Sequence, residues 1–406
     1  MNKRFPATAL AAALALSLAA CGSASSSTSN SGSGDSATIK IALIPPTTGA
    51  LAQFGTDAVK GWQIAVDEVN AKGGIDGHKV ELLKKGTDGD TATTLRVAKE
   101  AVAKEGAGFI GAVMTSPEHA ALNAQLQGLG ALSFNALGKD DALVGDQCAA
   151  NAFHIVQTNS MDINALAGSI GSMPGNKWAI VAVDYATGHS AAKEFTSAAK
   201  AAGKQVVSTQ FAPLNTTDFG SYITKVKSSG ADAVFAVEYG ADGIAFVKQA
   251  NQFNLTKSLK TVLGFNMVSE PLFPALGASI QGFYNNVGYD VAGDNTLNKT
   301  FVSDYTKKYG SAPYYVPADN YVAAETLFAG IDKADSIDPE KVRDALDGLT
   351  FDSIVGSVTM RADDHQLLRP SYLGQVVKGD GGDAFKIVAT AQPDKTTPQA
   401  ESACSF

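Results

Sequence analysis

Short apolar runs alternate with stretches of helical periodicity along most of this chain, and this alternation limits the folds open to it. In the first part, the apolar runs lie at residues 39–44, 80–83, 109–113 and 132–134. The helical stretches that separate them lie at residues 55–71, 91–105 and 118–126. This order predicts a parallel, doubly wound sheet with helices on both faces. Ligands bind such sheets at the carboxyl ends of the strands, so we expect functional residues in the loops that follow them.

A second unit with the same rhythm begins near residue 153. Its strands are expected at residues 178–183, 205–210, 233–237 and 260–263, and its helices at residues 191–202, 219–228 and 241–253. Beyond residue 286 the order changes to helices at residues 298–309, 318–334 and 339–347, with short strands up to residue 388. The two units span about 370 residues, more than one hydrophobic core usually holds. The sequence therefore predicts an α/β protein with two lobes.

The first 21 residues have the composition of an export signal. Lys3 and Arg4 precede an apolar run at residues 7–20, and small residues stand just before Cys21. The run is too short to span a bilayer. It resembles a bacterial lipoprotein signal, in which the cysteine thiol is acylated and becomes the first residue. The alternative is an ordinary secretory signal with a chance cysteine.

Both interpretations place the protein outside the cytoplasm, and the first anchors it to the cell membrane through lipidated Cys21. Residues 22–37 are almost wholly small and polar, which predicts a flexible stalk between this anchor and the first strand.

Two further cysteines, Cys148 and Cys404, are expected to form a disulfide in an oxidising compartment. Two separate buried thiols remain the alternative, because pairing cannot be deduced from sequence. The net charge of −8 argues against nucleic acid as a partner. We expect no metal and no cofactor.

The sequence carries no pattern typical of an enzyme. Gly-x-Ser-x-Gly, Walker and His-Glu-x-x-His patterns do not occur, and Gly73-Gly74 lacks a dinucleotide fingerprint. Asp363, Asp364 and His365 can be interpreted as an acid/base cluster or as a turn before a strand. The turn fits their loop-forming composition better. We therefore expect a protein that is not an enzyme.

Three segments of the first unit resemble a known family. Residues 39–49, 53–55 and 67–77 are similar to the opening of type I periplasmic binding proteins, and most closely to the leucine/isoleucine/valine-binding family. The most specific piece is Asn70, which is followed by Gly73-Gly74-Ile75 and Gly77. Members of that family are the solute receptors of ABC importers.

The resemblance implies two Rossmann-like lobes joined by a three-crossover hinge, with crossovers near residues 157, 288 and 351. The first lobe would comprise residues 38–157 plus 289–350, and the second residues 158–288 plus 351–390. Residues 391–406 would form a surface tail that Cys404 holds in place.

The resemblance also implies a function. A monomeric receptor traps a small-molecule ligand between its lobes by hinge closure and delivers it to separate permease and ATPase chains. An amino acid of the branched-chain type is the default ligand. The alternative is a ligand-sensing receptor component of the same fold that presents a small amide or carboxylate to a signalling partner.

In the first lobe the matching motifs point to three candidate ligand-binding residues. Phe54 matches an aromatic that faces the cleft, with a core aromatic as the alternative. Thr115 and Ser116 stand where the family holds a ligand carboxylate with hydroxyls and helix N-terminal amides. Alternatively, they only cap the helix that follows.

The loop after the strand at 132–134 departs from the family pattern. It contains Asn135, Gly138 and Lys139, and Lys139 stands about where relatives have a hydroxyl. This lysine either points to solvent or meets an anionic ligand directly.

In the second lobe, Tyr239 matches a tyrosine that covers the ligand in relatives. Glu238 beside it could pair with a ligand ammonium or face water. After the strand at 178–183, relatives usually have a tyrosine before a glycine. Tyr185 lies two residues from that position and could take its place. Asn266 replaces an acidic residue that often holds an amino group. A branched-chain amino acid is therefore only a default ligand.

Overall fold

The computed structural model describes residues 38–379, 382–404 and 406. The export signal, Cys21 and the stalk lie outside the described residues. Within the described part, no helix is both long enough and apolar enough to cross a bilayer.

The first lobe is built on a sheet of five parallel strands in the order β2-β1-β3-β4-β5. The strands are β1 Ile39–Leu43, β2 Val80–Lys84, β3 Phe109–Gly111, β4 Leu132–Asn135 and β5 Ala152–His154. The helices and short turns of this part are α1 Ala52–Ala71, α2 Thr91–Glu105, α3 Ser116–Leu129 and the 3-10 turn η1 Asp141–Val144. At Gly111 a Cβ atom would lie only 2.5 Å from the ring of buried Trp62 on α1. Glycine there lets the indole pack directly on the strand.

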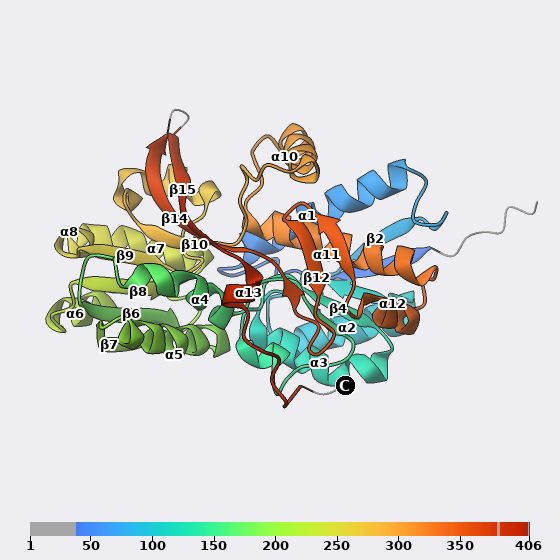
Figure 1. The fold of residues 1–406 in the computed structure, drawn as a ribbon, viewed down its shortest axis with the longest axis horizontal. Helices are drawn as coiled ribbons and strands as arrows, with labels where there is room; N and C mark the ends of the chain where they lie inside the picture. Colours follow the sequence, from blue (N-terminus) through green and yellow to red (C-terminus); the bar gives the residue numbers. More distant parts are fainter. Residues whose placement is uncertain (1–37, 380–381, 405) are drawn as a thin grey trace, which may run out of the picture. The chain divides into compact units, whose positions relative to one another are not determined.

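The second lobe contains a sheet of seven strands in the order β15-β14-β10-β9-β8-β6-β7. The strands are β6 Lys177–Val183, β7 Gln205–Ala212, β8 Ala233–Val237, β9 Thr261–Gly264, β10 Tyr284–Val287, β14 Ser371–Gly379 and β15 Gly382–Ala391. Strands β6 to β10 are parallel, whereas β14 and β15 are antiparallel to their neighbours. The two late strands therefore extend a sheet whose other strands precede them by about eighty residues or more, and Figure 1 shows them beside β10.

The helical elements of this lobe are α4 Asn159–Ile170, α5 Ala186–Ala201, α6 Gly220–Ser228, α7 Gly240–Gln252, α8 Leu255–Ser258, η2 Glu270–Leu272, α9 Phe273–Leu276 and η3 Gly277–Ile280. Helices α5, α6 and α7 each follow one strand of the parallel part, so each connection is a strand–helix–strand unit.

Three late helices return to the first lobe, namely α10 Thr296–Tyr309, α11 Tyr315–Ala334 and α12 Pro339–Leu346. Helix α11 packs along α1, and Asn320 accepts a hydrogen bond from the Trp62 indole at 3.0 Å. The late helices therefore complete the core of the first lobe.

A small antiparallel sheet also belongs with the first lobe. It consists of β11 Thr350–Ser353, β12 Gly356–Met360 and β13 Leu367–Leu368. Ser353 donates a hydrogen bond to Glu325 on α11 at 2.6 Å, and Gln366 bridges to His154 on β5. The resemblance implies a third crossover near residue 351, whereas the structure places it at residues 369–370. The reason is that these contacts hold residues 350–368 on the first lobe.

Arg369 ties the three crossovers together. Its guanidinium donates to the carbonyl of Ile155 at 3.5 Å in the first crossover and to that of Gly288 at 2.8 Å in the second. The same group forms an ion pair with Asp319 on α11 at 2.7 Å, and both side chains are buried. One side chain therefore holds all three connecting segments to a helix of the first lobe.

The C-terminal tail makes a fourth connection between the lobes. Helix α13 Pro393–Thr396 packs on α4 of the second lobe, where Asn164 donates to the carbonyl of Thr396 at 2.8 Å. Beyond it, Pro398 accepts a hydrogen bond from Arg361 of the first lobe at 2.6 Å. In the structure Cys404 is joined by a disulfide to Cys148, which precedes β5.

Candidate functional site

A small pocket lies where the two lobes face each other. Its walls come mostly from loops and helix starts that follow the carboxyl ends of strands in both sheets. The first lobe contributes Leu51, Phe54, Met114, Leu137, Lys139 and Tyr315. The second lobe contributes Tyr185, Thr187, Tyr239 and Asn266. A mostly apolar lining with a few polar groups is typical of sites for small organic ligands.

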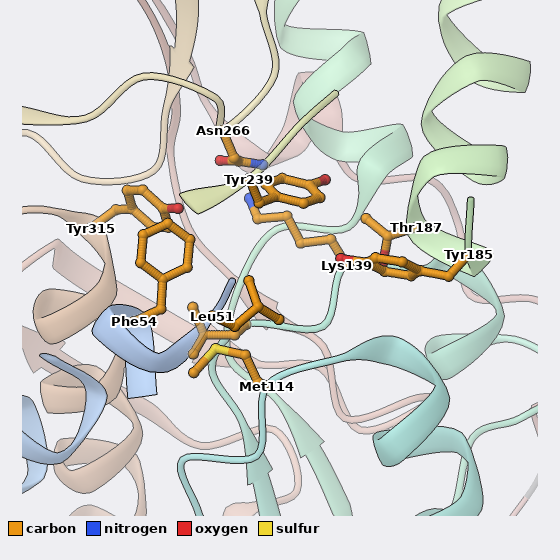
Figure 2. A pocket seen from close by; sticks show the side chains of 10 residues that line it. Leu51, Phe54, Met114, Lys139, Tyr185, Thr187, Tyr239, Asn266 and Tyr315 are labelled. Atoms are coloured by element: carbon orange, nitrogen blue, oxygen red, sulfur yellow. The ribbon is translucent and has the colours of Figure 1, made fainter. Parts of the chain in front are cut away.

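Aromatic rings form opposite walls of this pocket. Phe54 on α1 meets Tyr315 at the start of α11, with ring centroids 6.1 Å apart in an edge-to-face arrangement. Tyr185 and Tyr239, which precede α5 and α7, have centroids 6.5 Å apart. Figure 2 shows Phe54 and Tyr315 on one side of the pocket and Tyr185 on the other. Such walls favour a ligand with a flat or bulky apolar body.

Lys139 brings the one cationic group among the described residues that line the pocket. Its ammonium lies 2.6 Å from a carboxylate oxygen of Asp162 on α4, and the two side chains are 5% and 1% exposed. Asn286 on β10 donates to the same carboxylate oxygen at 2.9 Å and to Asn266 at 3.0 Å. A buried polar chain therefore runs from the first lobe into the second.

Burial affects the protonation of Asp162 in this row of hydrogen bonds. It raises the pKa of the Asp162 carboxyl above its ordinary value, and the nearby Lys139 ammonium opposes that shift. None of the described residues that line the pocket is an Asp or a Glu. The lining therefore offers a ligand one ammonium, several hydroxyls and an amide, but no carboxylate.

The comparison with known families decides the identity of this fold. The sequence model of a protein family described as periplasmic binding protein matches residues 38–382. This chain belongs to the periplasmic binding protein family. Two curated relatives of this binding protein are similar over most of its length. Leu/Ile/Val-binding protein homolog 7 of Brucella melitensis is 29% identical over 333 residues, which cover 78% of this chain and 83% of the relative. Homolog 8 of Brucella abortus is 30% identical over 331 residues, which cover 77% and 81%.

Solved structures of ABC transporter solute-binding proteins share the fold. One from Rhodopseudomonas palustris BisB5, in complex with 3,4-dihydroxybenzoic acid, has a TM-score of 0.82 at 21% identity and covers 89% of this chain and 99% of its own. The closed conformation of a leucine-, isoleucine-, valine-, threonine- and alanine-binding protein from Brucella ovis has a TM-score of 0.78 at 20% identity, covering 91% and 98%. The family and fold class predicted from the sequence are confirmed.

This chain thus belongs with the Leu/Ile/Val-binding protein homologues. Its family consists of extracytoplasmic solute-binding proteins, which are not enzymes.

Five of the ligand-binding candidates from the sequence lie in the lining of the binding protein's pocket. They are Phe54, Lys139, Tyr185, Tyr239 and Asn266. Asn266, two residues after the end of β9, adopts a left-handed backbone conformation with φ 51°, which asparagine tolerates better than most residues.

Thr115 and Ser116 lie outside the lining, and their hydroxyls have other partners. Thr115 caps α3 in a reciprocal arrangement with Glu118, whose carboxylate accepts from the threonine hydroxyl at 2.7 Å. Ser116 pairs with Thr187 of the second lobe at 2.5 Å and accepts from the backbone N–H of Asp140 at 3.2 Å. The capping interpretation describes Thr115, and Ser116 contacts the other lobe.

Asn135 and Gly138 also lie outside the lining, where they shape the loop that carries Lys139. The Asn135 amide donates to the carbonyl of Gly138 at 2.8 Å and accepts from its N–H at 2.8 Å. A Cβ on Gly138 would lie 2.9 Å from the His119 ring, so a side chain there would displace the loop.

Glu238 is fully buried but does not line the pocket, and neither of its carboxylate oxygens has a hydrogen-bond partner among the described residues. Burial, with a smaller contribution from Asp242, raises the pKa of Glu238 from 4.5 to about 9. The group is therefore protonated at neutral pH and does not offer an anion to a ligand ammonium.

Asp363, Asp364 and His365 lie away from the pocket, and residues 362–364 form a turn. The Asp364 carboxylate pairs with Arg361, and the His365 ring contacts Asp347 at 2.7 Å. These contacts hold the turn against the small sheet of the first lobe.

Sequence reasoning missed two kinds of residue. Four lining residues flank the chosen candidates in the same loops and helix starts, so a wider window around each strand end would have included them; they are Leu51, Met114, Leu137 and Thr187. Asp162 lies on α4, which follows the first crossover, and Tyr315 begins α11, which follows another helix, so the rule about strand ends applies to neither.

Proposed function

We propose that this binding protein is the receptor of an ABC importer and captures its ligand in the pocket between the lobes. The observation that carries the proposal is the origin of the lining, because six residues come from one lobe and four from the other. A ligand that contacts both sets favours the arrangement in which the lobes are together. The permease can then distinguish the loaded receptor from the empty one.

Contacts between the lobes support binding by hinge closure. Ser116 meets Thr187 across the lobe boundary, and the backbone N–H of Ala50 donates to Asn215 at 2.9 Å. These bonds surround the pocket without using its lining aromatics. Arg369 holds the crossovers about which the lobes would move.

The ligand that fits this lining has an aromatic or branched apolar body and lacks an ammonium group. Four aromatic rings and three aliphatic or thioether side chains would contact the body, and Lys139 would donate to a ligand oxygen. An amino acid would bury its ammonium without a carboxylate, which is costly. One related structure is of a leucine-, isoleucine-, valine-, threonine- and alanine-binding protein, and another is of a complex with 3,4-dihydroxybenzoic acid, so the fold accommodates both chemistries.

We further propose that Cys21 is acylated and anchors the receptor to the outer face of the cell membrane, with residues 22–37 as a tether. The basic start, apolar run and small residues before Cys21 support this anchor. Cys148 and Cys404 would then form the protein's disulfide.

A thermal-unfolding screen of the full-length protein in detergent tests the proposal. The ligands come in trios that share one body: leucine, 4-methylpentanoate and 4-methylpentanamide, and likewise phenylalanine, 3-phenylpropanoate and 3-phenylpropanamide. A ligand that binds only the folded state raises the unfolding midpoint. We expect a shift with at least one compound that lacks the amino group, and none with its parent amino acid. A larger shift with leucine or phenylalanine than with the acid and the amide of the same trio would contradict the proposed ligand class.

A further inference from the structure

The charge of the pocket depends on a residue that does not line it. Asp162 lies behind Lys139 on α4, and its carboxylate accepts one of the three N–H donors of the ammonium. The other donors remain for a ligand oxygen. Lys139 and Asp162 together carry no net charge, so the pocket is not a cationic site despite its lysine.

The surroundings of the pair reinforce this neutrality. The next charged groups in the hinge are Arg369 and Asp319, which also pair with each other and are buried. Asn286 supplies a neutral donor to Asp162 and adds no charge. The four ionisable groups therefore comprise two cations and two anions.

A ligand carboxylate at Lys139 would place a second anion beside one buried cation. Burying a charge without its own partner is unfavourable, and low polarity strengthens the repulsion between two carboxylates. A carbonyl or hydroxyl oxygen can accept the free N–H groups without this cost. The position of Asp162 therefore distinguishes two ligands of the same shape by charge.

We propose that Asp162 is the specificity-determining residue of this binding protein and selects uncharged ligands, such as amides, over carboxylates of the same shape. The inference rests on the proposed function, since it concerns the ligand of that same pocket. A carboxylate enters only with a proton, which the ligand or Asp162 takes up from solvent.

The test uses the acid and amide pair that gives the larger shift in the unfolding screen. Calorimetric titrations compare the full-length wild type in detergent with Asp162→Asn, which keeps the shape of the side chain and its contacts with Lys139 and Asn286. The control is Asp184→Asn, which removes the same charge from a half-exposed residue that precedes Tyr185 and pairs with His189.

We expect the wild type and Asp184→Asn to bind the amide at least tenfold more tightly than the acid. Asp162→Asn should reverse this preference, because Lys139 is then uncompensated. A wild type that prefers the acid tenfold, or an Asp162→Asn variant whose preference stays within threefold of the wild type, would overturn the assignment.

A second measurement covers the case in which Asp162→Asn does not fold. Titrating the wild type in two buffers of different ionisation enthalpy counts the protons taken up on binding. We expect about one proton with the acid and none with the amide, and equal uptake with both would overturn the assignment. If neither compound of either pair binds, the ligand class under the proposed function fails, and the specificity assignment fails with it.

Discussion

The ion pairs Arg369–Asp319 and Lys139–Asp162 are both buried, with every side chain at most 5% exposed. They differ in what else their cations reach. The Arg369 guanidinium also donates to backbone carbonyls in two crossovers, whereas the Lys139 ammonium borders a pocket. A buried ion pair thus stabilises the hinge in the case of Arg369, whereas in the case of Lys139 it borders the ligand pocket. Burial alone does not distinguish these roles, and the remaining partners of the cation do.

The largest effect is expected at the hinge pair. Replacing Arg369 with Met leaves the Asp319 carboxylate buried without its partner and removes the bonds to two crossovers. Such a loss typically costs about 3–5 kcal/mol in the free energy of unfolding. Urea unfolding measures it, with Arg343→Met as the control because the side chains of Arg343 and Asp344 are 29% and 67% exposed and their ion pair is not buried. A loss no greater in Arg369→Met than in the control would show that the hinge does not depend on this pair.

The disulfide between Cys148 and Cys404 attaches the C-terminal tail covalently to the first lobe. Replacing Cys148 and Cys404 with Ser should lower the free energy of unfolding by about 2–5 kcal/mol, which is typical for removal of a native disulfide. The variant should keep the ligand affinity of the wild type within threefold, because neither cysteine lines the pocket. Urea unfolding and calorimetry check the two statements. An unchanged free energy of unfolding would show that the disulfide of the tail does not stabilise the protein.

The pocket pair should show its role in binding. Lys139→Met removes the ammonium that donates to the ligand oxygen. A hydrogen bond to a charged group contributes about 1.5–3 kcal/mol, so affinity for the selected ligand should fall roughly 10- to 100-fold. Calorimetry measures this loss, and Arg343→Met again provides the control. An affinity within threefold of the wild type would remove Lys139 from the site.

Glu238 sharpens the comparison because it is a buried acid without a partner. Its pKa of about 9 in the folded protein lies above the ordinary 4.5. The folded state therefore keeps a proton that the unfolded chain releases, and stability falls as pH rises between these values. Glu238→Gln removes this dependence, so its stability should fall less steeply by up to about 1.4 kcal/mol per pH unit.

Urea unfolding of the wild type and Glu238→Gln at pH 5.5 and pH 8 measures the difference in slope. Other buried acids titrate equally in both proteins, so they cancel. Parallel pH profiles would show that Glu238 ionises normally in the folded state.

Most of the fold could be predicted from the sequence, because the central strands of both sheets are apolar runs that are buried on both faces. Strand β8, for example, is buried at every position and follows directly from its composition. The third crossover could not be placed in this way. Strands β11 to β13 are short and partly polar, and they stay on the first lobe through contacts such as that of Ser353 with Glu325. Such contacts between distant segments leave no local pattern.

The candidate site was partly predictable for the same reason. Residues that follow strands, such as Lys139 and Tyr239, lie in the pocket because parallel strands bring their carboxyl ends together. Asp162 could not be found in this way, since its importance comes from a contact with Lys139 that joins the two lobes. Thr115 shows the opposite case, because its hydroxyl serves the cap of its own helix.

The most direct test of the central claim is a crystal structure of the protein with the ligand that the unfolding screen selects. The account predicts density for the ligand body between Phe54 and Tyr239, with a ligand oxygen within hydrogen-bond distance of the Lys139 ammonium. Density at another place, or an ammonium held by the carboxylate of Glu238, would contradict it.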